Sequence, residues 1–461
     1  MESMCAVFRL FAPILLLALS LAAQTSPIEG AWEGALQLPT AKLRLRIHVK
    51  RAEGGAWSAT MDSPDQGAYG LPASSVTFEN NTLKWELSRI KASFEGQLNE
   101  AGTEIAGTFT QGMAFPMTLK RLDPAVAAGP KRPQEPKPPF PYTAQDVTFP
   151  SKAPGVTLAG TLTLPPGPGP HPAVILISGS GPQDRDESLM GHKPFWVLAD
   201  HLCRRGIAVL RYDDRGTAKS TGTFANATSA DFALDAEGAL DFLKTRPGIS
   251  TRKIGFAGHS EGGIIAPMLA SRRADVAFVV LLAGTAVPGA DVILEQGQAL
   301  AKAAGATEHQ LKSAREMQMK FNQAVKETPD PAELEKRLRE LMAGVPNADA
   351  QIRRVLTPWF RYFFTYDPAP ALAKVKCPVL ALYGGKDLQV LPDQNLPVLR
   401  AAFDKAGNKD VTILRLPGLN HLFQAAGTGA STEYAQIEET MSPAALDAVS
   451  SWLSKHTGLE K

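Results

Sequence analysis

A serine between two glycines is the first sign of chemistry in this sequence. The apolar run at residues 254–257 is typical of a buried strand, and Gly258-His259-Ser260-Glu261-Gly262 follows it directly, ahead of a predicted helix. A turn sharp enough to project a serine hydroxyl needs residues without bulk two positions before and after the serine, and Gly258 and Gly262 meet this need. Ser260 is therefore a candidate nucleophile. The alternative is a glycine-rich turn in which the serine is incidental.

A base and a carboxylate for this serine lie further along the chain. A serine hydroxyl is a poor nucleophile at neutral pH, so it needs a histidine base that a carboxylate orients, in the chain order serine, acid, histidine. Asp387 follows the apolar run 379–383, and His421 follows the run 411–416. Sites in parallel sheets form at the carboxyl ends of the strands, where both loops are expected to lie. We therefore predict that Asp387 and His421 serve Ser260.

Other acids and histidines fit these two roles less well. The loop at residues 281–285, after the preceding predicted strand, contains no carboxylate. Asp393 is the nearest rival acid, but it follows Pro392 at a predicted helix start, where an N-cap role explains it. His259 is expected to point elsewhere in the sharp turn, and His456 lies in a predicted terminal helix. The acid and base named above therefore remain the predicted pair.

Acyl transfer also needs N–H donors for the negative oxygen of the tetrahedral intermediate. The backbone N–H of Glu261, next to the serine, is the first predicted donor. The second is predicted in the glycine-rich loop 178–182, which follows the apolar run 173–178, and Ser180 is the best candidate there. The carboxylate of Glu261 has two open interpretations, which are contact with the substrate and a favourable interaction with the dipole of the helix that starts here.

The sequence predicts no cofactor and no metal site. The loop at 178–182 lacks the third glycine and the Lys-Ser/Thr pair of phosphate-binding motifs. Acids cluster at 184–186 and 213–214, but no histidine or cysteine lies at ligand spacing and no calcium-loop pattern is present. We expect these acids, with Arg185 and Arg215, to hold loops around the site as charged pairs.

The overall composition favours a small neutral substrate. The chain has 461 residues, with 48 Lys and Arg against 46 Asp and Glu, and a formal net charge of +2. Because no long basic run is present, the sequence lacks the electrostatic footprint of a nucleic-acid binder and a polybasic patch for a membrane. The length suggests roughly two or three domains. Nothing in the sequence predicts the oligomeric state.

Residues 1–23 have the pattern of a secretory signal peptide. Arg9 precedes an apolar run at 10–19, and small residues follow at 20–23. The run is too short to span a bilayer comfortably, and an uncleaved membrane anchor is the alternative. Cleavage near residue 22 or 23 predicts an exported protein without stable membrane insertion. It would leave two cysteines, Cys203 and Cys377, which are expected to be buried free thiols.

Three further segments follow. Residues 28–122 alternate apolar and polar residues in short runs between turns, which predicts about eight antiparallel strands in an accessory all-β barrel or sandwich. Prolines make residues 123–141 a semi-rigid linker, and a ligand for a proline-recognition module is the alternative. From 142 to 461, continuous apolar runs alternate with helical patterns, which predicts a mainly parallel sheet flanked by helices, an α/β domain.

A helical insertion at about 287–367 interrupts this alternation and is predicted to be a cap. No strand-like run occurs in it, and it is rich in Ala, Glu, Gln, Lys and Arg. Met317, Met319 and Met342, with the aromatic cluster at 359–364, are most simply the core of the cap itself. The apolar face of a cap also commonly closes over a substrate pocket, so this second role stays open.

Residues 142–461 resemble an α/β-hydrolase of the exported bacterial esterase and serine aminopeptidase-like (S33-type) group. The stretches that carry the resemblance lie at 179–186, 212–216, 258–263, 384–387 and 420–421. The resemblance implies a nucleophile, acid and base at Ser260, Asp387 and His421, the residues that position also selects. One departure is Ser178-Gly179 where the group usually has His-Gly in the oxyanion loop. The segment before residue 142 resembles the N-terminal extension of some exported esterases of this group.

The sequence therefore predicts a serine hydrolase that cleaves small or short-chain carboxylic esters through an acyl-enzyme intermediate. Two alternatives stay open. A serine aminopeptidase or acylpeptide hydrolase would need a carboxylate to bind the ammonium group of its substrate, and Glu261 or an acid of the cap is the candidate. A non-catalytic lipid- or glycan-binding protein would use the hydrolase fold only as a scaffold, and the presence of Ser260, Asp387 and His421 argues against it.

Overall fold

The computed structural model describes residues 26–37, 42–52, 54–66, 68–123, 130–345 and 347–459. The chain divides into two compact units, one through Ala128 and one from Gly129 onward. They are called the β unit and the α/β unit, and each is described by itself. The predicted signal peptide at 1–23 and residues 124–129 of the predicted linker lie outside the described residues.

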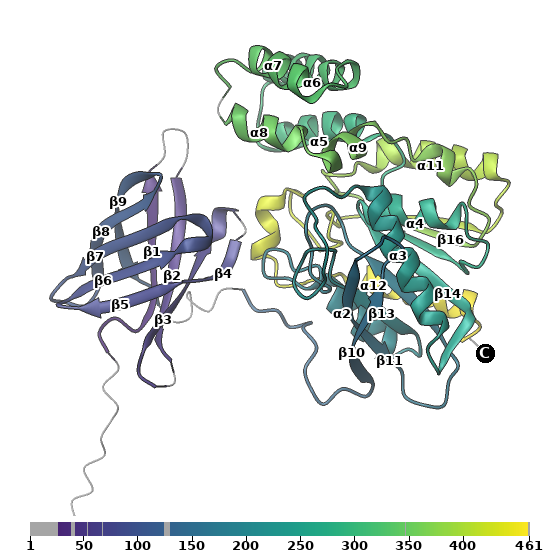
Figure 1. Cartoon of the computed structure of the whole chain (residues 1–461), viewed down its shortest axis with the longest axis horizontal. Coiled ribbons are helices and arrows are strands. Elements are labelled where there is room, and N and C mark those ends of the chain that lie inside the picture. The colour runs from purple at the N-terminus through teal and green to yellow at the C-terminus, as the bar shows by residue number, and fades with distance from the viewer. Residues whose placement is uncertain are drawn as a thin grey trace, which may run out of the picture. The chain divides into compact units, whose positions relative to one another are not determined.

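The β unit is an antiparallel sheet with nine strands among the described residues, in the order β4-β3-β2-β1-β9-β8-β7-β6-β5 (Figure 1). Period-two alternation explains the strands, since Leu83, Trp85 and Leu87 of β6 are buried and Lys84 and Glu86 between them are exposed. The strands are β1 (Gly30–Gln37), β2 (Lys42–Arg51), β3 (Trp57–Ser63), β4 (Ala68–Pro72), β5 (Ser75–Glu79), β6 (Thr82–Leu87), β7 (Ala92–Leu98), β8 (Glu104–Gln111) and β9 (Met113–Arg121). Two short 3-10 helices, η1 (Pro64–Gln66) and η2 (Ser88–Ile90), interrupt them.

The sheet of the β unit curls around an apolar core. Strands β3 and β5, near opposite ends of the strand order, contact each other. The inward faces bury Trp32, Trp85 and Phe109. The guanidinium of Arg121 lies 4.3 Å from the ring centroid of Trp32. The predicted small all-β unit is therefore confirmed.

The α/β unit contains a sheet of eight strands in the described part of the chain, in the order β10-β11-β13-β12-β14-β15-β16-β17. The first three strands in this order pair antiparallel, and the rest pair parallel. The predicted mainly parallel sheet is confirmed. Strands β10 and β11 are additional to the predicted runs. Strand β10 is a largely exposed edge strand without an apolar run, and Thr and Gly residues interrupt the apolar residues of the buried β11. The strands are β10 (Thr143–Pro150), β11 (Thr157–Leu164), β12 (His171–Ile177), β13 (Ala208–Tyr212), β14 (Ile249–His259), β15 (Val279–Leu282), β16 (Val379–Gly384) and β17 (Val411–Leu416).

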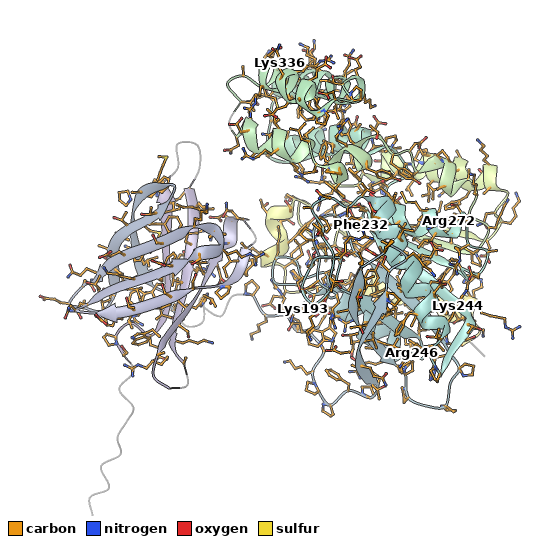
Figure 2. The ribbon with its side chains drawn as sticks, viewed as in Figure 1. Lys193, Phe232, Lys244, Arg246, Arg272 and Lys336 are labelled. Atoms are coloured by element: carbon orange, nitrogen blue, oxygen red, sulfur yellow. The ribbon has the colours of Figure 1, made fainter. Side chains whose placement is uncertain are left out.

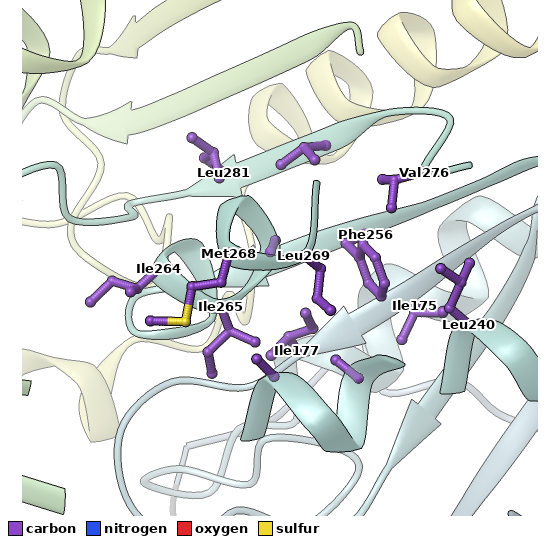
Figure 3. Packing of buried hydrophobic residues seen from close by; sticks show 14 of the residues in the cluster. Ile175, Ile177, Leu240, Phe256, Ile264, Ile265, Met268, Leu269, Val276 and Leu281 are labelled. Atoms are coloured by element: carbon purple, nitrogen blue, oxygen red, sulfur yellow. The ribbon is translucent and has the colours of Figure 1, made fainter. Parts of the chain in front are cut away.

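Helices cover both faces of this sheet, because alternate side chains of its strands are buried on opposite sides. Ile175 and Ile177 of β12 pack with α3, α4 and α11, whereas Val174 and Leu176 pack with α2 and α12. Figure 3 shows the first of these faces, where Leu269 of α4 lies among the strand residues. The helices are α2 (Pro194–Cys203), α3 (Ser229–Lys244), α4 (Gly262–Ala270), α11 (Pro392–Ala406) and α12 (Pro443–Thr457), with a short 3-10 helix, η3 (Ser431–Gln436).

Between β15 and β16 the chain forms further helices, which Figure 1 shows grouped on one side of the α/β unit. They enclose a core that includes Leu338 and Met342. Met317 and Met319 are 42% and 54% exposed, so the expectation that they belong to this core is wrong. Charged residues cover the outer side, as Figure 2 shows for the exposed Lys336. These helices are α5 (Gly289–Ala303), α6 (Glu308–Glu327), α7 (Pro331–Leu341), α8 (Ala348–Val355), α9 (Pro358–Thr365) and the short α10 (Ala369–Leu372).

The described end of the proline-rich segment is bound to the α/β unit. The guanidinium of Arg132 donates to the backbone oxygens of Gly191 at 3.0 Å and Ala435 at 2.7 Å. The side-chain amide of Gln134 donates to the backbone oxygen of Met441 at 2.7 Å and accepts its N–H at 3.0 Å. This segment therefore joins two loops of the α/β unit that are far apart in the sequence.

Candidate active site

Ser260 lies in a strained turn between β14 and α4. Its φ is +51°, in the left-handed region that residues other than glycine rarely adopt, and its N–H donates to the Leu282 oxygen at 2.9 Å. A Cβ added at Gly258 would lie 2.0 Å from the Gly262 oxygen, and one added at Gly262 would lie 2.2 Å from the Ile177 oxygen. No larger residue fits at either position without moving the backbone, so the two glycines permit the turn that carries Ser260.

Asp387 and His421 are hydrogen-bonded to each other. Asp387 follows β16 and His421 follows β17, and Nδ1 of His421 lies 2.7 Å from Oδ2 of Asp387. The other carboxylate oxygen accepts the N–H groups of Gln389 at 2.8 Å and Val390 at 2.9 Å. Both side chains are buried, with exposed fractions of 0% for Asp387 and 5% for His421. Because an ionised carboxylate only accepts, Nδ1 carries the proton and Nε2 of His421 is the basic nitrogen.

Ser260, His421 and Ser180 line one cavity of about 270 Å³. The predicted nucleophile and base, Ser260 and His421, therefore line the same cavity. The predicted acid, Asp387, is hydrogen-bonded to the base. Loops at the carboxyl ends of the parallel strands form one side of the cavity, and α5, α8 and α9 form the other. The face of the cap thus closes over the pocket, a role that the sequence left open. The cap residues that line the cavity are Val292, Ile293, Gln296, Arg354, Trp359, Phe360 and Phe363.

Glu187 links two parts of this site, and no motif in the sequence predicted its role. Its Oε1 accepts the Gly179 N–H at 2.7 Å and lies 2.8 Å from Nδ1 of His259. Nε2 of His259 lies 3.1 Å from the backbone oxygen of His421. Since both partners of the ring are acceptors, His259 donates from both nitrogens as an imidazolium. Burial lowers the pKa of His259, but the Glu187 carboxylate, the backbone oxygen of His421 and the charge of Asp387 together outweigh burial, and the net shift is upward from 6.5.

The prediction that His259 points away from the site is wrong. Its ring centroid lies 4.8 Å from that of His421, and it lines the same cavity as Ser260. The sequence offered one signal for Glu187, which is its place directly after the acidic run 184–186. That run could not single it out, because its contact with His259 depends on how the loop after β12 folds over the end of β14.

The two predicted oxyanion donors border Ser260. Glu261 is the N-cap residue of α4, and the first N–H groups of a helix have no acceptor within the helix. Ser180 lines the cavity beside Ser260. The preceding residue, Gly179, uses its own N–H for Glu187. The N–H of Gly179 is therefore occupied, and the backbone around Ser180 is held in place by a buried carboxylate.

The carboxylate of Glu261 is buried and tied to the cap. The Ser229 hydroxyl donates to it at 2.6 Å, and the indole Nε1 of Trp359 donates at 2.9 Å. Burial raises the pKa of Glu261, and hydrogen bonds from Ser229, Trp359 and Ser180 lower it in part. Glu261 is not among the described residues that line the cavity with Ser260. Its carboxylate thus connects α9 with the turn that carries the serine.

The acidic runs hold the loops around the site, as expected. Arg185 donates to Asp213 through Nε at 3.0 Å and Nη2 at 2.8 Å. Asp214 accepts the Ser178 hydroxyl at 3.0 Å and the Gln183 N–H at 2.9 Å. Burial raises the pKa of Asp214 well above its usual value. These bonds fix both ends of the loop that contains the predicted oxyanion donor.

The rival acid and histidine have other partners. Asp393 lies in the first turn of α11 and pairs with Arg415 at 2.6 Å. The N-cap residue of α11 is Leu391, so the expected N-cap role of Asp393 is wrong. A carboxylate in the first turn instead favours the helix dipole. His456 lies in α12, as expected, and contacts Asp410 at 3.0 Å.

Among the described residues there is neither a cluster of metal-binding side chains nor a membrane-spanning helix. No group of three or more His, Cys, Asp or Glu side chains there could hold a metal ion. No helix in that part of the chain is long and apolar enough to cross a bilayer. Cys203 is buried and Cys377 is half-buried, and both are free. Burial raises their thiol pKa values to about 12 for Cys203 and about 11 for Cys377.

Comparison with known proteins identifies the family. Residues 195–425, about half of the chain, match the family described as serine aminopeptidase, S33. The chain belongs to this S33 family. The matched residues include Ser260, Asp387 and His421. The S33 unit of this chain therefore has an α/β-hydrolase fold, and a β unit precedes it.

Individual relatives of this S33 chain include proteins named as esterases. Esterase EstD of Thermotoga maritima is 30% identical over 307 residues, which are 65% of this chain and 66% of that protein, just under two thirds of its length. Esterase Pf2001 of Pyrococcus furiosus is 19% identical, with 60% of this chain and 82% of that chain covered and a TM-score of 0.39. Est1E of Butyrivibrio proteoclasticus, solved with ferulic acid bound, is 17% identical, with 68% and 99% covered and a TM-score of 0.41.

Proposed function

We propose that this protein is a serine hydrolase that cleaves carboxylic esters of small or short-chain acyl groups. One observation carries the proposal. Ser260, in a strained turn, shares a cavity with His421, whose Nδ1 is 2.7 Å from the buried carboxylate of Asp387. This arrangement has the parts that acyl transfer needs, namely a projecting hydroxyl, a base and a group that orients the base. The name of the relative EstD supports an ester as the bond that is cleaved.

In the proposed mechanism, Nε2 of His421 accepts the proton of Ser260 while the serine Oγ attacks the ester carbonyl. The carbonyl oxygen becomes an oxyanion, which the N–H groups of Glu261 and Ser180 stabilise. Asp387 holds the ring and stabilises the imidazolium. His421 then gives its proton to the departing alcohol, and the acyl group stays on the serine. A water that His421 deprotonates attacks this acyl-enzyme, and the acid leaves as His421 returns the proton to Oγ of Ser260.

The size of the cavity supports a small acyl group. Its volume of about 270 Å³ lies slightly below the range of about 300–1,000 Å³ typical of ligand pockets. Its cap side contains Val292, Ile293, Phe360 and Phe363, which are suited to an apolar chain.

The aminopeptidase alternative needs a free carboxylate in the cavity, and the surroundings of Ser260 favour it less. Glu261 is buried with Ser229 and Trp359 as partners. Glu187 does line the cavity, but it is paired with His259. Arg354 also lines the cavity and would repel the ammonium group of a peptide substrate. A non-catalytic binder, the other alternative, has no need of a strained serine beside a histidine that a carboxylate holds.

Hydrolysis of nitrophenyl esters of short, medium and long acyl groups, beside aminoacyl nitroanilides, tests the proposal with wild type and Ser260→Ala in parallel. We expect turnover of short esters that the substitution abolishes. Turnover of the anilides alone would favour a peptidase instead. Ester hydrolysis that survives in Ser260→Ala would exclude Ser260 as the nucleophile. Absence of turnover in every assay would contradict the proposed substrate class and would require a broader substrate screen before any case for a binder.

We also propose that the protein is exported after removal of residues 1–23. The charge at Arg9, the apolar run at 10–19 and the small residues at 20–23 support this proposal. N-terminal sequencing of the protein recovered outside the cytoplasm should begin near residue 23 or 24. A mature protein that begins at Met1 would contradict cleavage.

A further inference from the structure

The cavity that contains Ser260 has one cationic side chain without a carboxylate partner. Four ionisable side chains are among the described residues that line it, namely Glu187, His259, His421 and Arg354. Glu187 is paired with His259, and His421 is bonded to Asp387. Arg354, from α8, is exposed and makes no ion pair with a described residue. Its guanidinium is therefore available to an anion in the cavity.

Three other arginines of the cap differ from Arg354 in this respect. Carboxylates of the cap itself hold Arg315, Arg337 and Arg339, through Glu295 at 2.8 Å, Glu327 at 3.0 Å and Glu335 at 2.8 Å. Ion pairs of this kind are typical of solvated helix faces, where they add little to the free energy of unfolding. The cap thus neutralises these arginines locally and leaves the charge of Arg354 at the cavity.

Arg354 contacts the aromatic residue beside it. Its Cζ lies 5.8 Å from the ring centroid of Trp359, close enough for a cation–π contact. Trp359 is itself held by the Glu261 carboxylate at 2.9 Å and by stacking on Phe363 at 5.4 Å. A second cavity of about 360 Å³ is lined by Ser180, Trp359 and Arg354, all of which line the first as well. Arg354 therefore borders both the cavity that contains Ser260 and this second cavity.

We propose that Arg354 binds a carboxylate on the substrate, so that the preferred substrates are short esters with a carboxylate on the acyl or the alcohol part. This inference rests on the proposed ester hydrolysis at Ser260. A guanidinium presents a planar set of N–H donors that matches a carboxylate, and a partly enclosed cleft strengthens the pairing relative to open solvent. Arg354 then determines specificity and takes no part in bond cleavage.

Two pairs of esters test the proposal. Monomethyl glutarate and methyl pentanoate have the same acyl length and differ in the carboxylate on the acyl part. The compounds 4-acetoxybenzoate and phenyl acetate differ in a carboxylate on the alcohol part. We expect kcat/KM to be at least about fivefold higher for the anionic member of one pair, with the difference mainly in KM. The advantage should shrink at high ionic strength, because salt screens the contact.

Arg354→Met and Arg353→Met form a matched pair of variants. Both remove one positive charge from α8, but Arg353 lines a separate hollow with Arg339 rather than the cavity at Ser260. The preference for the anionic ester, measured in each protein as the ratio of kcat/KM between the two members of a pair, should disappear in Arg354→Met and persist in Arg353→Met.

The outcomes separate this proposal from the function on which it rests. If wild type cleaves the neutral esters through Ser260 but shows no anionic preference in either pair, the role of Arg354 is wrong and the esterase proposal stands. A preference that survives in Arg354→Met, or that both variants lose equally, also overturns the role of Arg354. If no ester of either kind is cleaved, the proposed function itself fails.

Discussion

Oε1 of Glu187 lies 2.8 Å from Nδ1 of His259 and 2.7 Å from the backbone nitrogen of Gly179. One carboxylate thus holds the residue before the proposed nucleophile and the loop that carries Ser180. His259 passes this support on, because its Nε2 bonds to the backbone of His421 at 3.1 Å. Glu187 is therefore a positioning residue for both the oxyanion loop and the base.

The Glu187→Gln substitution should lower kcat for the best ester substrate by about tenfold to a hundredfold and change KM little. The amide keeps the size of the side chain but removes the charge that holds His259, so the backbone donor near Ser180 loses its alignment. Steady-state kinetics with a short nitrophenyl ester measure the change. Circular dichroism of the variant checks that the fold is intact. An unchanged kcat would contradict the positioning role.

The free energy of unfolding should depend on pH through the pair formed by Glu187 and His259. The pKa of His259 in the folded protein is raised above 6.5, so the folded state binds this proton more tightly than the unfolded chain. The contribution is fully present below pH 6.5 and is lost as the pH rises through the raised pKa. The difference in Tm between wild type and Glu187→Gln should therefore be largest in mildly acidic buffer and shrink in alkaline buffer. A Tm difference between the two proteins that grows with pH would contradict a raised pKa of His259.

Gly262, two positions after the serine, should tolerate no side chain. A Cβ at Gly262 would lie 2.2 Å from the Ile177 oxygen, so Gly262→Ala should cost about 3 kcal/mol or more of unfolding free energy. Gly297, within α5, has no atom within 4 Å of an added Cβ. Gly297→Ala should be neutral or stabilise by up to about 1 kcal/mol. Urea unfolding of both variants compares them, and equal effects would show that the close approach at Gly262 is unimportant.

Loss of the indole N–H of Trp359 should weaken the contact between the cap and the turn that carries Ser260. Trp359→Phe leaves the buried Glu261 carboxylate with one donor fewer, which should cost about 1–3 kcal/mol. We also expect a lower kcat for neutral esters, since the N–H of Glu261 is a proposed oxyanion donor. Trp196→Phe, in α2 on the other face of the sheet, is the matched control for losing an indole. Equal losses in both variants would rule out a specific role for Trp359.

The end of the proline-rich segment should stabilise the α/β unit. Arg132→Met removes guanidinium hydrogen bonds to Gly191 and Ala435, so unfolding of the α/β unit should become easier by about 1–3 kcal/mol. Lys137→Met is a control for charge loss in the same segment, because Lys137 is exposed. Thermal unfolding measures both variants. If Arg132→Met behaves like Lys137→Met, the segment acts only as a tether.

Local patterns of residues were enough to predict several parts of this protein. Gly258 and Gly262 mark the turn at Ser260 because steric limits act between near neighbours in the chain. Asp387 and His421 could be selected because continuous apolar runs locate parallel strands, and the carboxyl ends of such strands lie at one edge of the sheet.

Contacts between segments that are distant in the sequence could be learned only from the tertiary structure. Glu187 meets His259 across 72 positions, and Trp359 meets Glu261 across 98. No periodicity records such contacts, because they depend on how a loop and a cap helix fold over the sheet. The same reason explains Met317 and Met319, which a helical pattern suggested for the core but which lie on the exposed side of the cap. A pattern of residue types fixes which elements form, whereas packing fixes which of their side chains meet.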